Sequence, residues 1–168
     1  MATTSPSSPS QLTPQDALKA FGRSIASSVF VVTATDADGA AHGATISAGV
    51  SLSLDPPLVL ICLGHGSSTL AALRSSGCFR VHVLGAGQDA VSRAFAGKDR
   101  AAYAAHLGGN DSNGAPMLRL AVAAARCRVA TEFAAGDHAL VVGALEDVAI
   151  TAAAPLIYHR GGYAALAA

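Results

Sequence analysis

The segment GATISAGVSLSLDPPLV, residues 43–59, is the most informative stretch of the chain for the fold. Its hydroxyl side chains recur at even spacings, at Thr45, Ser47, Ser51 and Ser53. This spacing places them on one face of an extended strand, unless a bulge near Gly49 intervenes. Hydroxyls and free main-chain N–H groups at a strand end can bind a phosphate or the polar edge of an aromatic ring system. A solvated outer strand face explains the same pattern equally well.

The segments on either side alternate short β-branched runs with turn residues. This texture predicts strands at residues 29–35, 42–53, 58–63, 79–84, 120–133 and 138–150, with a closing strand pair around 159–163. Helices are expected at residues 13–27, 67–75 and 88–96, and a polar loop at 108–116. The almost wholly apolar run 58–63 predicts a strand buried on both faces. The expected fold is mainly β, a small barrel of about six antiparallel strands with helices packed outside.

Composition favours one compact domain. Of 168 residues, 51% are hydrophobic and 13% are charged, with a formal net charge of zero. We expect one domain over residues 12–168, preceded by a disordered Ser- and Pro-rich tail at 1–11. The absence of net positive charge argues against nucleic acid or an anionic membrane as partner. Low charge combined with a high apolar fraction favours a homodimer.

The cysteines and the chain start bear on the compartment. Cys62, Cys78 and Cys127 show no CxxC spacing, which argues against disulfides and against a zinc site. No apolar run approaches the roughly 20 residues that span a bilayer. Residues 1–15 lack a basic residue before an apolar stretch, so no secretory signal is expected. These features predict a cytoplasmic protein with reduced thiols.

A second hydroxyl cluster, Ser67 to Thr69, follows the Gly-His-Gly sequence at 64–66 and stands at an expected helix start. The free N–H groups of a helix N-terminus favour an anion such as phosphate. A plain helix cap is the alternative interpretation.

Several motifs, taken in order, resemble one known family. They are FGRSIASSVFVVTA at 21–34, HGATISAGVSLSLDPPLVLICL at 42–63, SST at 67–69, FRVHVL at 79–84, FAGKDR at 95–100, GDH at 136–138 and YHRGGY at 158–163. Together they resemble the flavin reductase-like family of FMN-binding split barrels. The resemblance extends over nearly the whole chain after the N-terminal tail.

The resemblance implies an NAD(P)H-dependent reductase of FMN or FAD. Such proteins are usually homodimers, and commonly supply reduced flavin to a separate monooxygenase. Hydride passes from the nicotinamide to the flavin, so no side chain is expected to act as a catalytic acid, base or nucleophile, and no metal is expected. A flavin-binding barrel that does not turn over, serving as sensor, store or electron carrier, is the main alternative. A pyridoxamine-phosphate oxidase relative ranks lower, because clustered basic residues for its substrate are not evident.

Site residues follow from the resemblance. The isoalloxazine and ribityl chain are expected to meet Thr45, Ile46, Ser47 and Ala48. The phosphate side is expected to meet Cys62, Leu63, Gly64, Ser67, Thr69 and Arg100. The nicotinamide nucleotide is expected near His138, His159, Arg160, Gly161, Tyr163 and Ser28. Plain structural roles remain open: Arg100 as a surface charge, His138 as a turn residue, and His159 and Tyr163 as barrel-closing residues.

Three positions depart from the family pattern. Ser28 stands where glycine is usual, Gly49 replaces a bulky residue, and His82 replaces an asparagine in the FxVNVL-like strand. The small residue at Gly49 is expected to open the isoalloxazine site. Such an opening would admit FAD or another electron acceptor.

Overall fold

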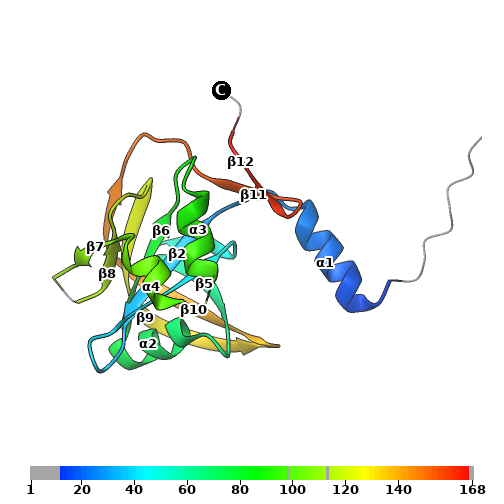
Figure 1. Cartoon of the computed structure of the whole chain (residues 1–168). Helices are drawn as coiled ribbons and strands as arrows, with labels where there is room; N and C mark the ends of the chain where they lie inside the picture. The colour runs from blue at the N-terminus through cyan, green and yellow to red at the C-terminus, as the bar shows by residue number, and fades with distance from the viewer. Residues whose placement is uncertain (1–11, 98, 113, 167–168) are drawn as a thin grey trace, which may run out of the picture.

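The protein is described here by a computed structural model of residues 12–166, with the exception of residues 98 and 113. The tail expected at residues 1–11 lies outside the described residues. A seven-stranded antiparallel sheet dominates the structure, in the order β3-β2-β6-β9-β10-β5-β4 (Figure 1). Its strands are β2 (Phe30–Thr35), β3 (Ala41–Ile46), β4 (Gly49–Leu54), β5 (Pro57–Gly64), β6 (Cys78–Val83), β9 (Ala123–Ala135) and β10 (His138–Ile150).

The two ends of this sheet are consecutive in the chain. Only Ser47 and Ala48 separate β3 at one end from β4 at the other. The sheet must therefore curl until its two ends meet, although β3 and β4 are not hydrogen-bonded to each other. The resulting barrel, open along one seam, confirms the predicted mainly β class.

Strand β2 lies between two hydrophobic clusters. Val32 and Ala34 belong to the barrel core, together with Ile61 and Phe79, and all four are fully buried. Val31 points to the opposite face and joins a second cluster. That cluster also contains Val29, Leu84, Phe95, Tyr103 and Leu156. Burial on both faces makes β2 the wall between the barrel core and the helices that carry Phe95 and Tyr103.

Three helices lie outside the barrel (Figure 1): α2 (Ser68–Ser76), α3 (Asp89–Ala96) and α4 (Arg100–Ala104). Helix α2 packs against β2 and β3, and α3 packs against β3. Gly43 permits the close approach of α3, because a Cβ atom there would lie 2.5 Å from the ring of Phe95. The predicted α2 and α3 are confirmed, whereas α4 was not expected.

The N- and C-terminal segments form a separate layer beside the barrel. Helix α1 (Pro14–Ser24) leads into β1 (Ser27–Ser28), which pairs with β11 (Ile157–His159), and β11 pairs with β12 (Gly162–Ala164). The main-chain N–H of Arg160 donates to the carbonyl of Arg23, 3.1 Å away, and so joins the β11–β12 turn to α1. No residue of α1 is buried, and the helix projects away from the barrel (Figure 1). Within residues 12–166, leaving out 98 and 113, no helix is long and apolar enough to cross a membrane.

The sequence prediction differs from the structure at several further places. The expected strand 42–53 is two strands, because the chain bends at Ser47 and Ala48, and this split raises the strand number in the main sheet to seven. Helix α1 ends at Ser24 rather than near Ser27, since residues 27–28 pair with β11. The expected loop at 108–116 contains part of a hairpin, β7 (Leu107–Asn110) with β8 (Pro116–Leu118). In β5 only Ile61 and Leu63 are fully buried, so the expectation of burial on both faces is wrong.

Candidate flavin and nicotinamide site

Three adjoining cavities lie on the helix-bearing side of the barrel. The large cavity, of about 520 Å³, is bounded by β3, the start of α2, the end of α3 and α4. The small cavity, of about 200 Å³, is bounded by the end of β3, α3 and the C-terminal hairpin. The hairpin cavity, of about 470 Å³, lies between α3 and the C-terminal hairpin. Thr45 lines both the large and small cavities, and Tyr163 lines both the small and hairpin cavities.

Thr45 is held against α3. Its hydroxyl donates a 2.6 Å hydrogen bond to the main-chain carbonyl of Ser92. The remaining lone pairs of the Thr45 oxygen can accept a hydrogen bond from a ligand. Ile46 and Ser47 continue from Thr45 along the small cavity. The structure therefore brings three of the four residues expected at the isoalloxazine together at one cavity.

The N-terminus of α2 forms one wall of the large cavity. Ser67 caps this helix, since its hydroxyl accepts from the N–H of Leu70. Thr69 follows in the first turn and is only 1% exposed, yet its Oγ1 has no hydrogen-bond partner among the described residues. A buried hydroxyl without a partner is costly and indicates a ligand or water that is not part of the chain.

Arg100 approaches the same cavity from α4. Its Nη2 donates to the carbonyl of Ala41, 2.8 Å away, while Arg100 itself remains exposed. None of the described residues that line the large cavity is acidic. A phosphate group binds well to hydroxyls, a helix N-terminus and a guanidinium, and no carboxylate among the described lining residues competes with it here. The residues present therefore fit the phosphate of a flavin nucleotide.

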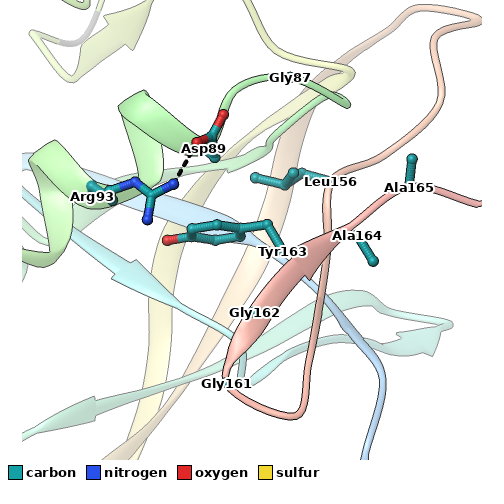
Figure 2. Close-up of a pocket in the computed structure, with 9 residues that line it drawn as sticks. All are labelled: Gly87, Asp89, Arg93, Leu156, Gly161, Gly162, Tyr163, Ala164 and Ala165. Atoms are coloured by element: carbon teal, nitrogen blue, oxygen red, sulfur yellow. Dashed lines mark hydrogen bonds and ion pairs between the residues drawn. The ribbon is translucent and has the colours of Figure 1, made fainter.

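Figure 2 shows the hairpin cavity, with the Tyr163 ring beside the guanidinium of Arg93. The distance from Arg93 Cζ to the ring centroid is 4.9 Å, which is a cation–π contact. Arg93 also forms an ion pair of 2.5 Å with Asp89, one helical turn earlier. The Tyr163 hydroxyl donates to Ser92 Oγ at 2.8 Å. Ser92 thus links Thr45 on the barrel to Tyr163 on the hairpin.

The other predicted site residues do not line these three cavities. They are Ser28, Ala48, Cys62, Leu63, Gly64, His138, His159 and Arg160. The side chain of Leu63 belongs to the barrel core, so only its main chain can meet a ligand. Burial raises the pKa of the half-buried Cys62 thiol. His138 is exposed at the start of β10, with Nδ1 2.7 Å from Asp137 Oδ1, and it pairs with Gly64 in the sheet.

Comparisons with known proteins identify the family of the chain. The model of the "Flavin reductase like domain" family matches residues 21–167. The chain belongs to the flavin reductase-like family. It is 37% identical to the reductase component of 4-hydroxyphenylacetate 3-monooxygenase of Thermus thermophilus, over 73% of this chain and 77% of the relative. It is 39% identical to the NADH:riboflavin 5'-phosphate oxidoreductase of Streptomyces pristinaespiralis, over 81% and 79%. The solved structure of the flavin reductase PheA2 in its native state is 31% identical, with a TM-score of 0.82, over 94% of this chain and 100% of the other.

The structure shows the surroundings of the three positions that depart from the flavin reductase-like pattern. A Cβ atom on Gly49 would lie 3.2 Å from the ring of Phe30, so that ring occupies the room that glycine leaves. The idea that Gly49 enlarges the isoalloxazine site therefore finds no support. Ser28 pairs with Ile157 in the small terminal sheet. His82 is 1% exposed and bridges β2 and β8, since Nε2 accepts from the Leu118 amide and Nδ1 lies 3.2 Å from the Val31 carbonyl.

Sequence reasoning missed several residues that form the cavities of this flavin reductase-like protein: His42, Asp89, Ser92, Arg93, Phe95 and Tyr103. Two of them, His42 and Phe95, lie within motifs that had been recognised, HGATIS and FAGKDR. Elsewhere, no group of three or more metal-ligating side chains occurs in the part of the chain that the structure describes.

Proposed function

We propose that this protein reduces FMN or FAD with NADH as hydride donor. The proposal rests on two cavities that share Thr45. The large cavity is lined by hydroxyls and a cation, and the small cavity is more apolar. A flavin nucleotide has this same division, with a phosphate at one end and an aromatic ring system at the other. The Streptomyces pristinaespiralis relative, whose name specifies NADH and riboflavin 5'-phosphate, supports the choice of donor and acceptor.

Each cavity takes one part of the ligands in this proposal. Thr45, Ile46 and Ser47 hold the isoalloxazine side, with Ala48 beside them. Ser67, Thr69 and Arg100 hold the phosphate, and Cys62, Leu63 and Gly64 lie behind them in β5. The nicotinamide nucleotide lies on the hairpin side, at Gly161 and Tyr163. His138, His159, Arg160 and Ser28 remain proposed contacts of that nucleotide.

The bound nicotinamide and flavin supply the redox chemistry, because hydride passes between them. The described side chains contribute binding, orientation and the exclusion of water. The hydrogen bonds of Ser92 to Thr45 and Tyr163 fix the flavin side and the nicotinamide side to the same helix, α3. This arrangement sets the relative position of the two ligands without a catalytic acid or base.

We further propose that the reduced flavin leaves and serves a separate monooxygenase. The Thermus thermophilus relative, named as a reductase component, supports this role. The alternative is a barrel that retains its flavin and does not turn over. The test is to mix the purified protein with NADH and excess FMN or FAD and follow the nicotinamide absorbance. Many equivalents of NADH oxidised per protein support the reductase, and one equivalent or none contradicts it.

We also propose that residues 12–168 form one domain and that two chains form a homodimer. The proposed location is the cytoplasm. The apolar residues Leu18 and Phe21 of α1 are 68% and 63% exposed, and Leu54 of β4 is 89% exposed. Side chains of this kind gain free energy when another surface covers them. Light scattering after size-exclusion chromatography tests this. A mass of twice the chain is expected, and a monomer at micromolar concentration contradicts it.

A further inference from the structure

His42 has a buried ring nitrogen for which neither the fold nor the proposed reaction accounts. The residue lies on β3 and lines the large cavity, and its side chain is 11% exposed. Its Nε2 lies 2.7 Å from Asp36 Oδ2. Its other nitrogen, Nδ1, is buried without a hydrogen-bond partner among the described residues. A buried polar atom of this kind calls for an explanation.

The contact with Asp36 determines which nitrogen of His42 carries a proton. Asp36 Oδ1 accepts from the amides of Asp38 and Ala40, so the carboxylate is fixed in the β2–β3 turn. The hydrogen bond with His42, followed by that from the Ala40 amide, lowers the pKa of Asp36. An ionised carboxylate only accepts hydrogen bonds, so we assign a proton to Nε2. In the neutral ring, Nδ1 is then a hydrogen-bond acceptor with a lone pair. In the charged ring, it is a second N–H donor.

The surroundings of His42 favour an anion in the large cavity. Thr69 Oγ1, also buried and unpartnered, lines the same cavity. Arg100 and Tyr103 of α4 both donate to the carbonyl of Ala41, next to His42. Among the described residues, Asp36 on its own hairpin contacts His42, and Arg100 and Tyr103 of α4 line the same cavity as His42. No acidic side chain is among the described residues that line the cavity itself.

We propose that His42 is a phosphate-binding residue, whose Nδ1 takes up a proton when the flavin phosphate binds and donates a hydrogen bond to it. Asp36 balances the charge of the resulting imidazolium from the opposite side of the ring, as carboxylates do for other positioned histidines. The proton comes from solvent, and no covalent bond to the flavin forms or breaks. This inference rests on the proposed binding of flavin in the large cavity. It adds a residue and a proton linkage to that site.

The test is calorimetric titration at about pH 8, where a phosphate monoester is already fully ionised. FMN and riboflavin, which lacks the phosphate, are each titrated into the wild-type protein. Each titration is repeated in two buffers of different ionisation enthalpy, because the difference in heat counts the protons taken up. We expect FMN to bind with net uptake of a proton and riboflavin with none. FMN binding without uptake overturns the inference and leaves flavin binding intact, whereas failure of both flavins to bind overturns the inference and the proposed function.

Two variants locate the proton. His42→Gln is expected to bind FMN about 10- to 100-fold more weakly, without proton uptake, and riboflavin as the wild type does. Asp36→Asn keeps the histidine and removes the balancing charge, so uptake is expected to fall while the ring remains in place. Circular dichroism and thermal unfolding establish that each variant is folded. If His42→Gln folds and its proton uptake on FMN binding is unchanged, the inference is overturned. If His42→Gln does not fold, unchanged proton uptake in Asp36→Asn overturns it instead.

Discussion

The hydroxyl of Thr45 donates a 2.6 Å hydrogen bond to the main-chain carbonyl of Ser92, and so joins the barrel to helix α3. Ser92 is fully buried, so its main-chain carbonyl is shielded from bulk solvent. The same residue accepts from Tyr163 through its side chain. The strand that carries the proposed flavin contacts and the hairpin that carries the proposed nicotinamide contacts therefore share one anchoring residue.

Replacement of Thr45 by Val removes this donor and keeps the side-chain shape. We expect the free energy of unfolding to fall by about 1 kcal/mol, since a carbonyl loses its partner. The dissociation constant of FMN should rise about threefold to tenfold, because the strand end is less firmly held. Chemical denaturation and flavin fluorescence titration measure the two effects. Thr45→Ser retains the hydroxyl and serves as the matched control; a Val variant equal to the Ser variant in both assays would contradict the role of this hydrogen bond.

Tyr163→Phe removes the hydroxyl that bonds to Ser92 and retains the ring beside Arg93. The C-terminal hairpin then loses one attachment to α3, and the KM for NADH is expected to rise about threefold to tenfold. Ser92→Ala removes the same hydrogen bond from the other side and should have a similar effect. Steady-state kinetics of both single variants and the double variant form a mutant cycle. If the two effects simply multiply, the residues act independently and the link is not functional.

Gly43→Ala tests the packing of α3 on the barrel. The added Cβ would lie 2.5 Å from the ring of Phe95, which is 2% exposed and has little room to move. Overpacking of this kind typically costs about 1–3 kcal/mol of unfolding free energy. Flavin affinity should fall with it, because Phe95 also lines the large cavity. Gly22→Ala, where an added Cβ meets nothing within 4 Å, is the control and should not lower stability; equal stability of the two variants would show that α3 is free to shift.

His82 makes the fold sensitive to acid. Burial lowers the pKa of His82 from 6.5 to about 4. The unfolded chain therefore binds a proton at a higher pH than the folded protein does, and stability falls as the pH drops from about 6.5 to 4. The expected loss is about 3 kcal/mol, from the size of the shift.

His82→Asn, which places a non-titrating polar side chain at this position, isolates the contribution of His82. Denaturant unfolding at a series of pH values should show a shallower decline in stability for the variant than for the wild type. Carboxylates affect both proteins alike, so they cancel in the difference. Parallel curves for the two proteins would mean that the fold does not lower the pKa of His82.

Local sequence patterns were sufficient for most of the fold. Alternating β-branched residues and the Asp-Gly turn at 38–39 predicted β2 and the start of β3, and Ser67 marked the start of α2 correctly. The break between β3 and β4 was missed because the even spacing of hydroxyls continues across Ser47 and Ala48. Helix α4 has five residues, which is too short to show a helical period.

The candidate site was less accessible from sequence. Thr45, Ser67 and Thr69 were singled out by their hydroxyl pattern, and the family motifs assigned them and Arg100 to the flavin. The structure places all four at one cavity. Ser92 and His42 were not named, because their roles depend on contacts between distant segments. The hydrogen bond of Ser92 to Tyr163 spans 71 positions of sequence, and the unpartnered nitrogen of His42 is visible only once its neighbours are placed. Half-burial of β5 likewise depends on what lies across that face, which no local pattern reveals.

In the proposed function, the protein reduces free flavin repeatedly with NADH. The most direct test is an anaerobic experiment with excess NADH and a large excess of FMN over protein, in which the loss of oxidised-flavin absorbance is counted per protein chain. A reductase that turns over is expected to reduce nearly all the FMN, many molecules per chain. Bleaching that stops at one flavin per chain, or does not occur with either FMN or FAD, would contradict it.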